Sequence, residues 1–230
     1  MTSEARSEVR RGVHGPYGYG DRPGGTHKVI LGRVRDSVTV LDVGCNRGYL
    51  GRELHMRGCR VWGIDQDSDA LEQIPADTYE DVAALDLDTV TALPWPGQQF
   101  DTIVAADVLE HLRDPGRMLD VLVSALSRQG RILVSLPNVA HASIRANLLR
   151  GHFDYQNSGI LDRTHLHLFT FDSARRFIES AGLEVTATLS GSNRFGTFLN
   201  SRRRAGKRLR TLLAFNIIME AQPVARPLSP

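Results

Sequence analysis

The residues with the clearest chemical potential lie in a glycine-rich segment, which reads VLDVGCNRGYL at positions 40–50. Glycine permits tight turns and lets a ligand approach the backbone closely. The dinucleotide-binding fingerprint G-x-G-x-x-G would need glycine two and five residues after Gly44, where this chain has Asn46 and Tyr49. Asp42 can instead receive an ammonium group. The segment therefore predicts a cofactor that carries an amino acid, and a dehydrogenase is the least favoured interpretation.

Two further carboxylates follow predicted strands. Asp65 lies 21 residues after Gly44, at the end of a predicted strand, where a carboxylate can bind both hydroxyls of a ribose. Asp86 ends the next predicted strand and can accept a hydrogen bond from the exocyclic amine of adenine. Asp67 is better suited to capping the helix that follows. Together Asp65 and Asp86 indicate a nucleoside in the ligand.

The elements that must position these residues alternate along the chain. Short apolar, β-branched runs predict strands at 38–43, 60–64, 82–85, 100–105 and 131–136. Helices are predicted at 50–57, 67–74 and 114–127, the last with Asp114 as its cap and Pro115 at its first position. Such alternation implies right-handed crossovers in a parallel, doubly wound sheet. Ligands of such sheets bind beyond the carboxyl ends of the strands.

The C-terminal part departs from this alternation. Residues 138–170 form a long connection with one predicted helix at 140–149, and long connections are often functional. Asp172 is predicted to cap a helix that Gly182 ends. Two last strands, at 184–189 and 212–219, have no predicted helix between them. The expected fold is α/β: a doubly wound, mostly parallel, seven-stranded Rossmann-like sheet with an antiparallel hairpin at its C-terminal edge.

Length and composition bound the class of protein. The chain has 230 residues, of which 41% are hydrophobic and 23% charged, as in an ordinary globular protein. Its two cysteines exclude a disulfide framework, and no apolar run is long enough to span a membrane. The N-terminus lacks the apolar core of a secretory signal. We expect a cytoplasmic protein without a membrane partner.

The domain organisation is predicted to be simple. Residues 24–222 form one domain, and 223–230 form a tail with three prolines. Residues 1–23 are expected to be a mobile tail or a lid. In the lid interpretation Tyr17 and Tyr19, which stand among glycines, close over the ligand.

A fourth segment gives the chain a family resemblance. Residues 100–112 read FDTIVAADVLEHL and follow ALPWP at 92–96. With VLDVGCNRGYL and the Gly63-Ile64-Asp65 segment, in that order, they resemble the class I S-adenosylmethionine-dependent methyltransferases, in particular their small-molecule methyltransferase domains. The similarity spans about residues 29–190. It implies S-adenosyl-L-methionine as the cofactor and methyl transfer as the activity.

The resemblance also assigns roles by position. It places Asp42, Gly44 and Gly48 in the loop that holds the methionine part, and Asp65 at the ribose with Gln66 over the adenine. It places five more residues around the cofactor: Asp86, Leu87, Asp107, Val108 and His111. Asn46 departs from the usual glycine, although asparagine tolerates a left-handed backbone. Residues 29–136 would then hold the cofactor, and residues 137–200 would form the acceptor side.

Histidines of the acceptor side are candidates for a general base. His141 follows the fifth strand, and His165 and His167 would share one side of an extended chain. Histidine suits deprotonation of a hydroxyl acceptor near neutral pH. In the alternative, Asp162 and His165 only hold the loop in place. Asn138 is expected near the substrate. Histidines and cysteines do not cluster at zinc spacing, so we expect no metal.

A basic run separates the last two strands. It consists of Arg202, Arg203, Arg204, Lys207, Arg208 and Arg210. The net charge is +2; without these six, 22 basic side chains face 26 acidic ones and the charge becomes −4. Aromatic residues do not interleave the run, which disfavours single-stranded nucleic acid as a partner.

The expected acceptor is a small molecule, methylated on a hydroxyl oxygen, such as a natural-product or sugar intermediate. An anionic or carrier-bound acceptor would suit the basic run. A nucleic-acid methyltransferase and a non-catalytic S-adenosylmethionine-binding protein are the alternatives. We expect a monomer or a homodimer.

Overall fold

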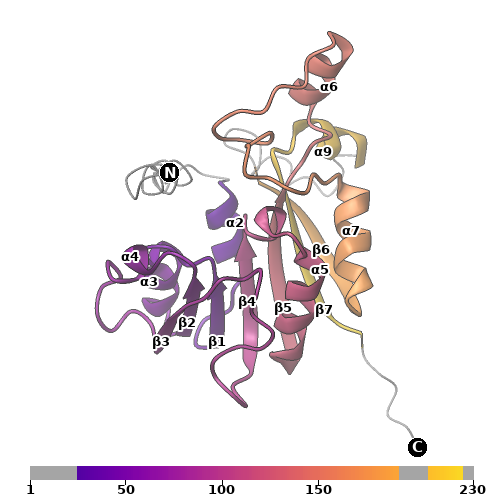
Figure 1. Ribbon diagram of the computed structural model, residues 1–230. Coiled ribbons are helices and arrows are strands. Elements are labelled where there is room, and N and C mark those ends of the chain that lie inside the picture. Colours follow the sequence, from indigo (N-terminus) through magenta and orange to yellow (C-terminus); the bar gives the residue numbers. More distant parts are fainter. Residues whose placement is uncertain (1–24, 192–206, 225–230) are drawn as a thin grey trace, which may run out of the picture.

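The computed structural model describes residues 25–191 and 207–224 of the chain, and Figure 1 shows their arrangement. Seven strands form one sheet in the order β3-β2-β1-β4-β5-β7-β6. Five strands run parallel: β1 (Thr39–Val43), β2 (Arg60–Asp65), β3 (Asp81–Ala84), β4 (Phe100–Ala106) and β5 (Leu126–Pro137). The predicted mostly parallel, seven-stranded sheet is therefore confirmed.

The last two strands run against the other five. β7 (Asn216–Pro223) pairs antiparallel with β5, and β6 (Leu183–Gly191) pairs antiparallel with β7 at the sheet edge. The expected antiparallel pair is present, but the strand predicted at 212–219 is partly wrong. A helix, α9 (Lys207–Leu213), takes the start of that range. An apolar run such as LLAFNIIM fits a buried strand and a buried helix equally well, so periodicity alone could not place the boundary.

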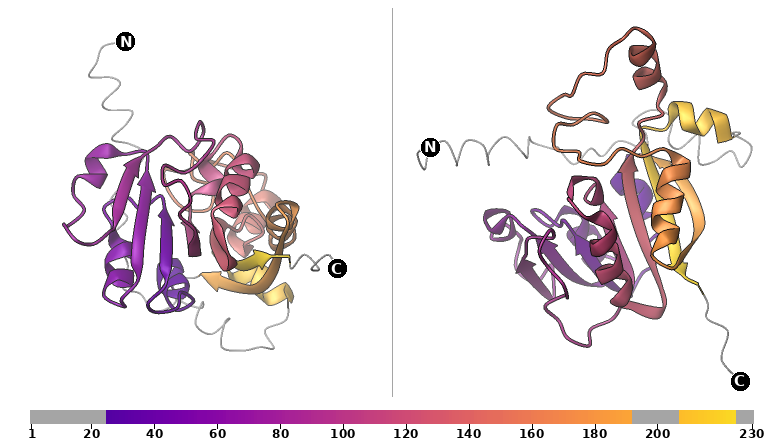
Figure 2. Two further views of the ribbon diagram at one scale, coloured as in Figure 1. Left: turned by 90° about the horizontal axis from the view of Figure 1, so that it is seen from below. Right: turned by 45° about the vertical axis from the view of Figure 1, so that its right-hand side comes forward.

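Alternating side chains divide the core between the two faces of the sheet. On one face Leu41, Ile103 and Ile132 pack in a cluster with α5 (Pro115–Ser124) and α7 (Phe171–Ser180). On the other face their neighbours pack with α2 (Thr26–Leu31) and α3 (Tyr49–His55); these neighbours are Val40, Val104 and Leu133. Figure 2 shows helices on both sides of the sheet. This is the double winding expected for strands with both faces buried.

Caps set where several helices begin. Asp67 Oδ1 accepts a hydrogen bond of 3.1 Å from Ala70 N at the start of α4 (Ser68–Leu71), and Asp114 caps α5 with Pro115 at its first position, as predicted. The predicted cap of α7 is wrong. Thr170, not Asp172, is the N-cap, because Thr170 and Ser173 exchange side-chain and backbone hydrogen bonds in a capping box. The short helix α2 was not predicted at all.

The carboxyl ends of the parallel strands lie at the upper edge of the sheet in Figure 1. The long connection after β5 and its helix α6 (Ala142–Leu149) rise above this edge. A short 3-10 helix, η1 (Leu109–His111), follows β4 there. Within the described ranges, the model holds no helix that is both long and apolar enough to cross a membrane.

Candidate functional site

The loop after β1 has the backbone shape that the glycine pattern predicts. Gly44, Asn46 and Gly48 all have positive φ, of 73°, 48° and 72°. Asn46 therefore adopts the left-handed conformation that asparagine tolerates, and the loop keeps its turn without a third glycine. The amides of Gly44 and Cys45 both donate to the Ile64 carbonyl, at 2.7 and 3.1 Å. A Cβ on Gly44 would lie 2.6 Å from Val108 Cγ2, so this loop packs directly on the segment after β4.

Asp65 ties this loop to the end of β2. Its Oδ2 accepts a hydrogen bond of 2.8 Å from Asn46 N, and its Oδ1 accepts one of 2.9 Å from Asp67 N. The side chain is buried, whereas Gln66 beside it is exposed. A carboxylate offers about four lone-pair sites, so two remain for ligand hydroxyls. Asp65 is the last residue of β2, as the sequence predicts, and its role as the ribose ligand stays a prediction.

Asp42 lies beneath the loop in contact with a residue that the sequence did not single out. The Tyr79 hydroxyl donates a hydrogen bond of 2.7 Å to Asp42 Oδ2. Burial raises the pKa of Asp42 to about 7; the hydrogen bond from Tyr79 opposes this, and the charge of Asp65 adds to it. Burial and the charge of Asp42 also raise the pKa of Tyr79. Asp42 is therefore poised to ionise when a cation arrives.

Tyr79 explains a glycine that belonged to no motif. A Cβ on Gly51 would lie 2.1 Å from Tyr79 Cζ, and one on Gly63 would lie 2.9 Å from Tyr79 Cε1. Gly51, in α3, and Gly63, in β2, therefore leave room for the tyrosine ring. Gly51, inside a helix, was the signal in the sequence that a large side chain approaches there, whereas Gly63 already belonged to the Gly63-Ile64-Asp65 segment.

The segment predicted to contact adenine lies next to Asp65, and its two named residues differ in burial. Leu85 N donates to the Asp65 carbonyl at 2.8 Å. Asp86 lies two residues beyond β3 rather than at its end; it is exposed, and its Oδ1 accepts from Asp88 N at 2.9 Å. Leu87 is buried in the core cluster of α5 and α7. Of the two, Asp86 is the residue available to a ligand.

Asp107 joins the ends of three strands. Its Oδ1 accepts hydrogen bonds from Ser135 Oγ at 2.7 Å and from Asn216 Nδ2 at 2.6 Å. Its backbone has φ of 56°, and its amide donates to Ser135 Oγ. His27 of α2 lies close enough to feel the Asp107 charge, which opposes a lowering of the His27 pKa by burial. Ser135, Asn216 and His27 were missed, because nothing local in the sequence marks them.

A second group of side chains surrounds η1. The rings of His111 and His165 meet edge to face with 4.8 Å between their centroids. Glu110 Oε1 lies 4.0 Å from His165 Nε2, and Glu110 Oε2 is buried without a hydrogen-bond partner among the described residues. Burial raises the pKa of Glu110 well above its usual value, and the charge of Asp107 adds to this effect. Burial also lowers the pKa of His111, to which neighbouring His165 contributes.

Hydrogen bonds fix the tautomers of both rings. His111 Nδ1 lies 3.2 Å from the Thr164 carbonyl, and His165 Nδ1 lies 3.0 Å from the Ile160 carbonyl. Because a carbonyl can only accept, each neutral ring carries its proton on Nδ1. Each Nε2 is therefore left with a lone pair.

The connection from 160 to 167 wraps over η1. The amides of Leu166 and His167 both donate to the Glu110 carbonyl, at 2.8 and 3.1 Å. Asp162 Oδ1 accepts from both the amide and the hydroxyl of Thr164. The chain turns from Asp162 to His165, where His165 N donates to the Asp162 carbonyl at 3.1 Å. That His165 and His167 share one side of the chain stays a prediction. These contacts agree with the alternative in which Asp162 and His165 hold the loop.

His141 and Asn138 serve the backbone around them. His141 Nδ1 accepts from Ser143 N at 3.2 Å at the start of α6, so its neutral ring carries the proton on Nε2. Burial lowers its pKa. Asn138 is fully buried: its amide group donates to the carbonyls of Thr211 and Ala214, and its Oδ1 accepts from Ala140 N. The expected place of Asn138 beside the substrate is therefore wrong, because all its polar atoms are turned inward.

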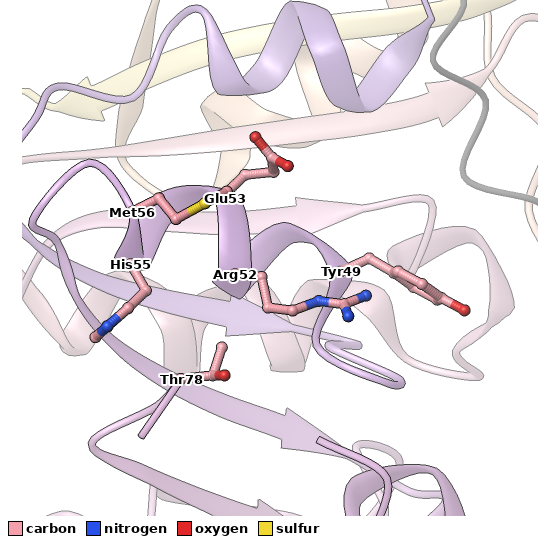
Figure 3. A pocket seen from close by; sticks show the side chains of 6 residues that line it. All are labelled: Tyr49, Arg52, Glu53, His55, Met56 and Thr78. Atoms are coloured by element: carbon pink, nitrogen blue, oxygen red, sulfur yellow. The ribbon is translucent and has the colours of Figure 1, made fainter. Parts of the chain in front are cut away.

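The predicted lid and part of the basic run are not among the residues described at this site. Tyr17, Tyr19 and Arg202–Arg204 lie outside the described residues. Arg210 donates to the Thr188 carbonyl at 3.2 Å. Figure 3 shows a surface pocket along α3 whose walls include Arg52, Met56 and Thr78, and it contains none of the predicted site residues.

Comparisons with known proteins agree with this geometry. A family model described as a methyltransferase domain matches residues 7–188. The ubiquinone biosynthesis O-methyltransferase of Pseudomonas paraeruginosa (strain DSM 24068 / PA7) is 33% identical over 104 residues, which are 44% of this chain and 44% of that protein. The match therefore covers less than half the length of this curated relative.

Solved structures share the fold. The magnesium protoporphyrin IX methyltransferase of Synechocystis PCC 6803 with bound SAH has a TM-score of 0.60 at 18% identity, over 96% of this chain and 95% of that one. A TehB-like SAM-dependent methyltransferase from Corynebacterium glutamicum has a TM-score of 0.59 at 19% identity, over 96% and 97%. At these identities the likeness shows the fold, while the family match covers most of the chain. The chain therefore belongs to the methyltransferase-domain family, and it shares the fold of these S-adenosylmethionine-dependent methyltransferase structures.

Proposed function

We propose that this protein transfers a methyl group from S-adenosylmethionine to a hydroxyl oxygen of a small molecule. The observation that carries the proposal is the contact between Gly44 and Val108. It sets the loop with Asp42 and Asp65 directly against the segment that leads to Glu110 and His111. A cofactor site and a set of acid–base groups thus lie side by side at the carboxyl edge of the sheet, where such sheets bind ligands.

The residues around the loop fit the proposed cofactor. Asp42, buried and with a pKa of about 7, suits the ammonium of the methionine part, because a cation would stabilise its ionised form. Asp65 has lone pairs left for ribose hydroxyls, and the exposed Asp86 is available to an adenine amine. When bound, the cofactor supplies a methyl group already activated on a sulfonium. The chain must then align the acceptor and exclude water, and alignment alone can lower the barrier by several kcal/mol.

The tautomers distinguish two of the three candidate bases, His141 and His165. A general base needs a lone pair that faces the acceptor. His141 offers an N–H at Nε2, since Ser143 occupies its Nδ1. His165 keeps a lone pair at Nε2, and its ring lies beside that of His111. We therefore favour His165 over His141 as the base, and His167 stays a candidate without a ranking.

The oxygen acceptor rests on the curated relatives, which are named O-methyltransferases. A natural-product or sugar intermediate of secondary metabolism is the acceptor class we propose. If this acceptor is anionic or carrier-bound, the basic run at 202–210 would attract it. Residues 137–200 would provide the acceptor side, since the long connection rises above the loop (Figure 1).

The alternatives have less support. Arg210 is the member of the basic run whose side chain is described. Its Nη1 donates to the Thr188 carbonyl, so this nitrogen is not directed at a phosphate. Asn46, the residue that favoured a non-catalytic protein, takes the left-handed shape of the glycine it replaces. The loop therefore supplies no reason for lost cofactor binding.

The test measures turnover with a panel of phenolic, catecholic and sugar hydroxyl acceptors. The formation of S-adenosylhomocysteine reports the turnover. We expect turnover with at least one acceptor and calorimetric binding of S-adenosylhomocysteine. Asp65→Ala should abolish that binding, whereas Asp69→Ala, an exposed carboxylate of α4, should not change it. Binding without turnover across the panel would favour the non-catalytic alternative, and activity confined to nucleic acid would overturn the small-molecule acceptor.

A further inference from the structure

We propose that Glu110, His111 and His165 bind a divalent transition-metal ion beside the cofactor loop. One carboxylate oxygen and one nitrogen from each ring lie within 4.8 Å of one another. Glu110 and His111 come from η1, and His165 comes from the connection that wraps over it. Spacing along the chain did not reveal this group, because the third member is far from the first two in sequence.

The rings are already oriented as metal ligands. Histidines that bind metals usually donate their other ring N–H to a carbonyl or carboxylate, which fixes the tautomer and the ring plane. His111 and His165 do this through the carbonyls of Thr164 and Ile160. His165 Nε2 lies 4.0 Å from Glu110 Oε1, and one nitrogen of each ring belongs to the group whose ligand atoms lie within 4.8 Å of one another.

Glu110 supplies the second observation. Its side chain is 1% exposed, and its Oε2 has no hydrogen-bond partner in the described part of the chain. Burying a carboxyl group without a partner is costly, so such groups are normally paired or bound to a metal. A hydrogen bond to His165 does not satisfy it, because 4.0 Å from Oε1 to Nε2 is too long. A cation between Glu110 and the two rings would satisfy the carboxylate.

The donor set indicates the class of ion. Two imidazole nitrogens with one carboxylate oxygen suit Zn²⁺, Mn²⁺, Fe²⁺ or Co²⁺. Mg²⁺ and Ca²⁺ prefer sites made entirely of oxygen. Bonds of about 2.0–2.2 Å would draw the three ligand atoms closer together than they stand here, which small side-chain rotations can achieve.

Three protein ligands leave at least one coordination position open. Catalytic metal sites use such a position for water or substrate. In the consequence that rests on the proposed function, the acceptor hydroxyl would bind there and the ion would lower its pKa, so that its proton passes to solvent water. Its oxygen would then take the methyl group as the bond from that carbon to the sulfonium breaks, which leaves S-adenosylhomocysteine. His165 would then be a ligand rather than the base, and the expectation of a metal-independent enzyme would be wrong.

Metal binding can be tested without cofactor or acceptor. Protein stripped with EDTA is titrated with Zn²⁺, Mn²⁺ and Co²⁺ by calorimetry, and the Co²⁺ complex is followed by visible absorption, which reports nitrogen ligation. We expect one ion per chain. Glu110→Gln and His165→Ala should each weaken binding at least about 10-fold. His152→Ala, an exposed histidine of the same connection, should bind as the wild type does.

Circular dichroism and binding of S-adenosylhomocysteine verify that each variant is folded. The proposal is overturned if the wild type binds no ion, or if Glu110→Gln and His165→Ala bind it as the wild type does. The two proposals fail separately. Metal binding without methyl transfer to any acceptor would overturn the function alone, and turnover that persists in metal-free protein without measurable ion binding would overturn the metal site alone.

Discussion

The Tyr79 hydroxyl donates a 2.7 Å hydrogen bond to Asp42 Oδ2 beneath the glycine loop. This contact links the segment before β3 to the last polar residue of β1, and it partly offsets the cost of burying Asp42. The carboxylate that we propose for the ammonium of the cofactor is thus held by a residue outside every recognised motif. Three of the following predictions depend on this pair.

Tyr79→Phe removes the hydroxyl and leaves Asp42 Oδ2 buried without this donor. We expect a loss of about 1–3 kcal/mol in the free energy of unfolding, because an unsatisfied buried acceptor bears its full desolvation cost. Denaturant unfolding measures it. Tyr155→Phe, at an exposed position, should change stability by less than about 0.5 kcal/mol. Equal stability of Tyr79→Phe and the wild type would mean that the contact has no energetic weight.

Gly51→Ala places a methyl group 2.1 Å from Tyr79 Cζ. Overpacking of this kind costs about 1–3 kcal/mol, although alanine is otherwise the better helix former. Gly116→Ala is a matched control in α5, because its Cβ would meet no atom closer than 3.5 Å, and it should stabilise the protein. In a double-mutant cycle, Tyr79→Ala should rescue Gly51→Ala. Additive losses would show that Tyr79 is not the obstacle.

Asp42 should make stability fall as the pH rises from about 4 to about 7. Its pKa is about 7 in the folded protein and about 3.9 in an unfolded chain. Between these values the folded state binds more protons than the unfolded state, so raising the pH favours unfolding. The effect amounts to a few kcal/mol and ends near pH 7. Glu110 acts in the same direction, so the comparison is between wild type and Asp42→Asn, whose slope should be flatter. Identical slopes would contradict the prediction.

Binding of S-adenosylhomocysteine should depend on pH with the opposite sign. Its ammonium, placed at Asp42, favours the ionised carboxylate, so binding releases a proton below pH 7. Affinity should increase up to about 10-fold per unit from pH 5 to pH 7 and then level off. Calorimetry in two buffers of different ionisation enthalpy measures the proton release. Affinity that does not change over this range would place the ammonium elsewhere.

Much of the fold followed from local pattern. Apolar runs alternating with capped helices predicted the parallel strands, because both faces of such strands are buried. Asp42, Gly44, Gly48 and Asp65 could be placed at the carboxyl edge for the same reason, since each stands where a strand ends. The positive φ of Asn46 agrees with the expectation that asparagine tolerates a left-handed backbone.

The rest required the tertiary structure, because it depends on residues that are distant in sequence. Sheet order brings Asn216 of β7 to Asp107 after β4, and the long connection returns His165 to Glu110. Burial then changes what residue type alone suggests. Asn138 is buried rather than open to a substrate, and burial raises the pKa values of Asp42 and Glu110. Local periodicity records which face of an element is apolar. It does not predict which polar groups come into contact when those faces pack. In this chain those contacts determine the chemistry of the site.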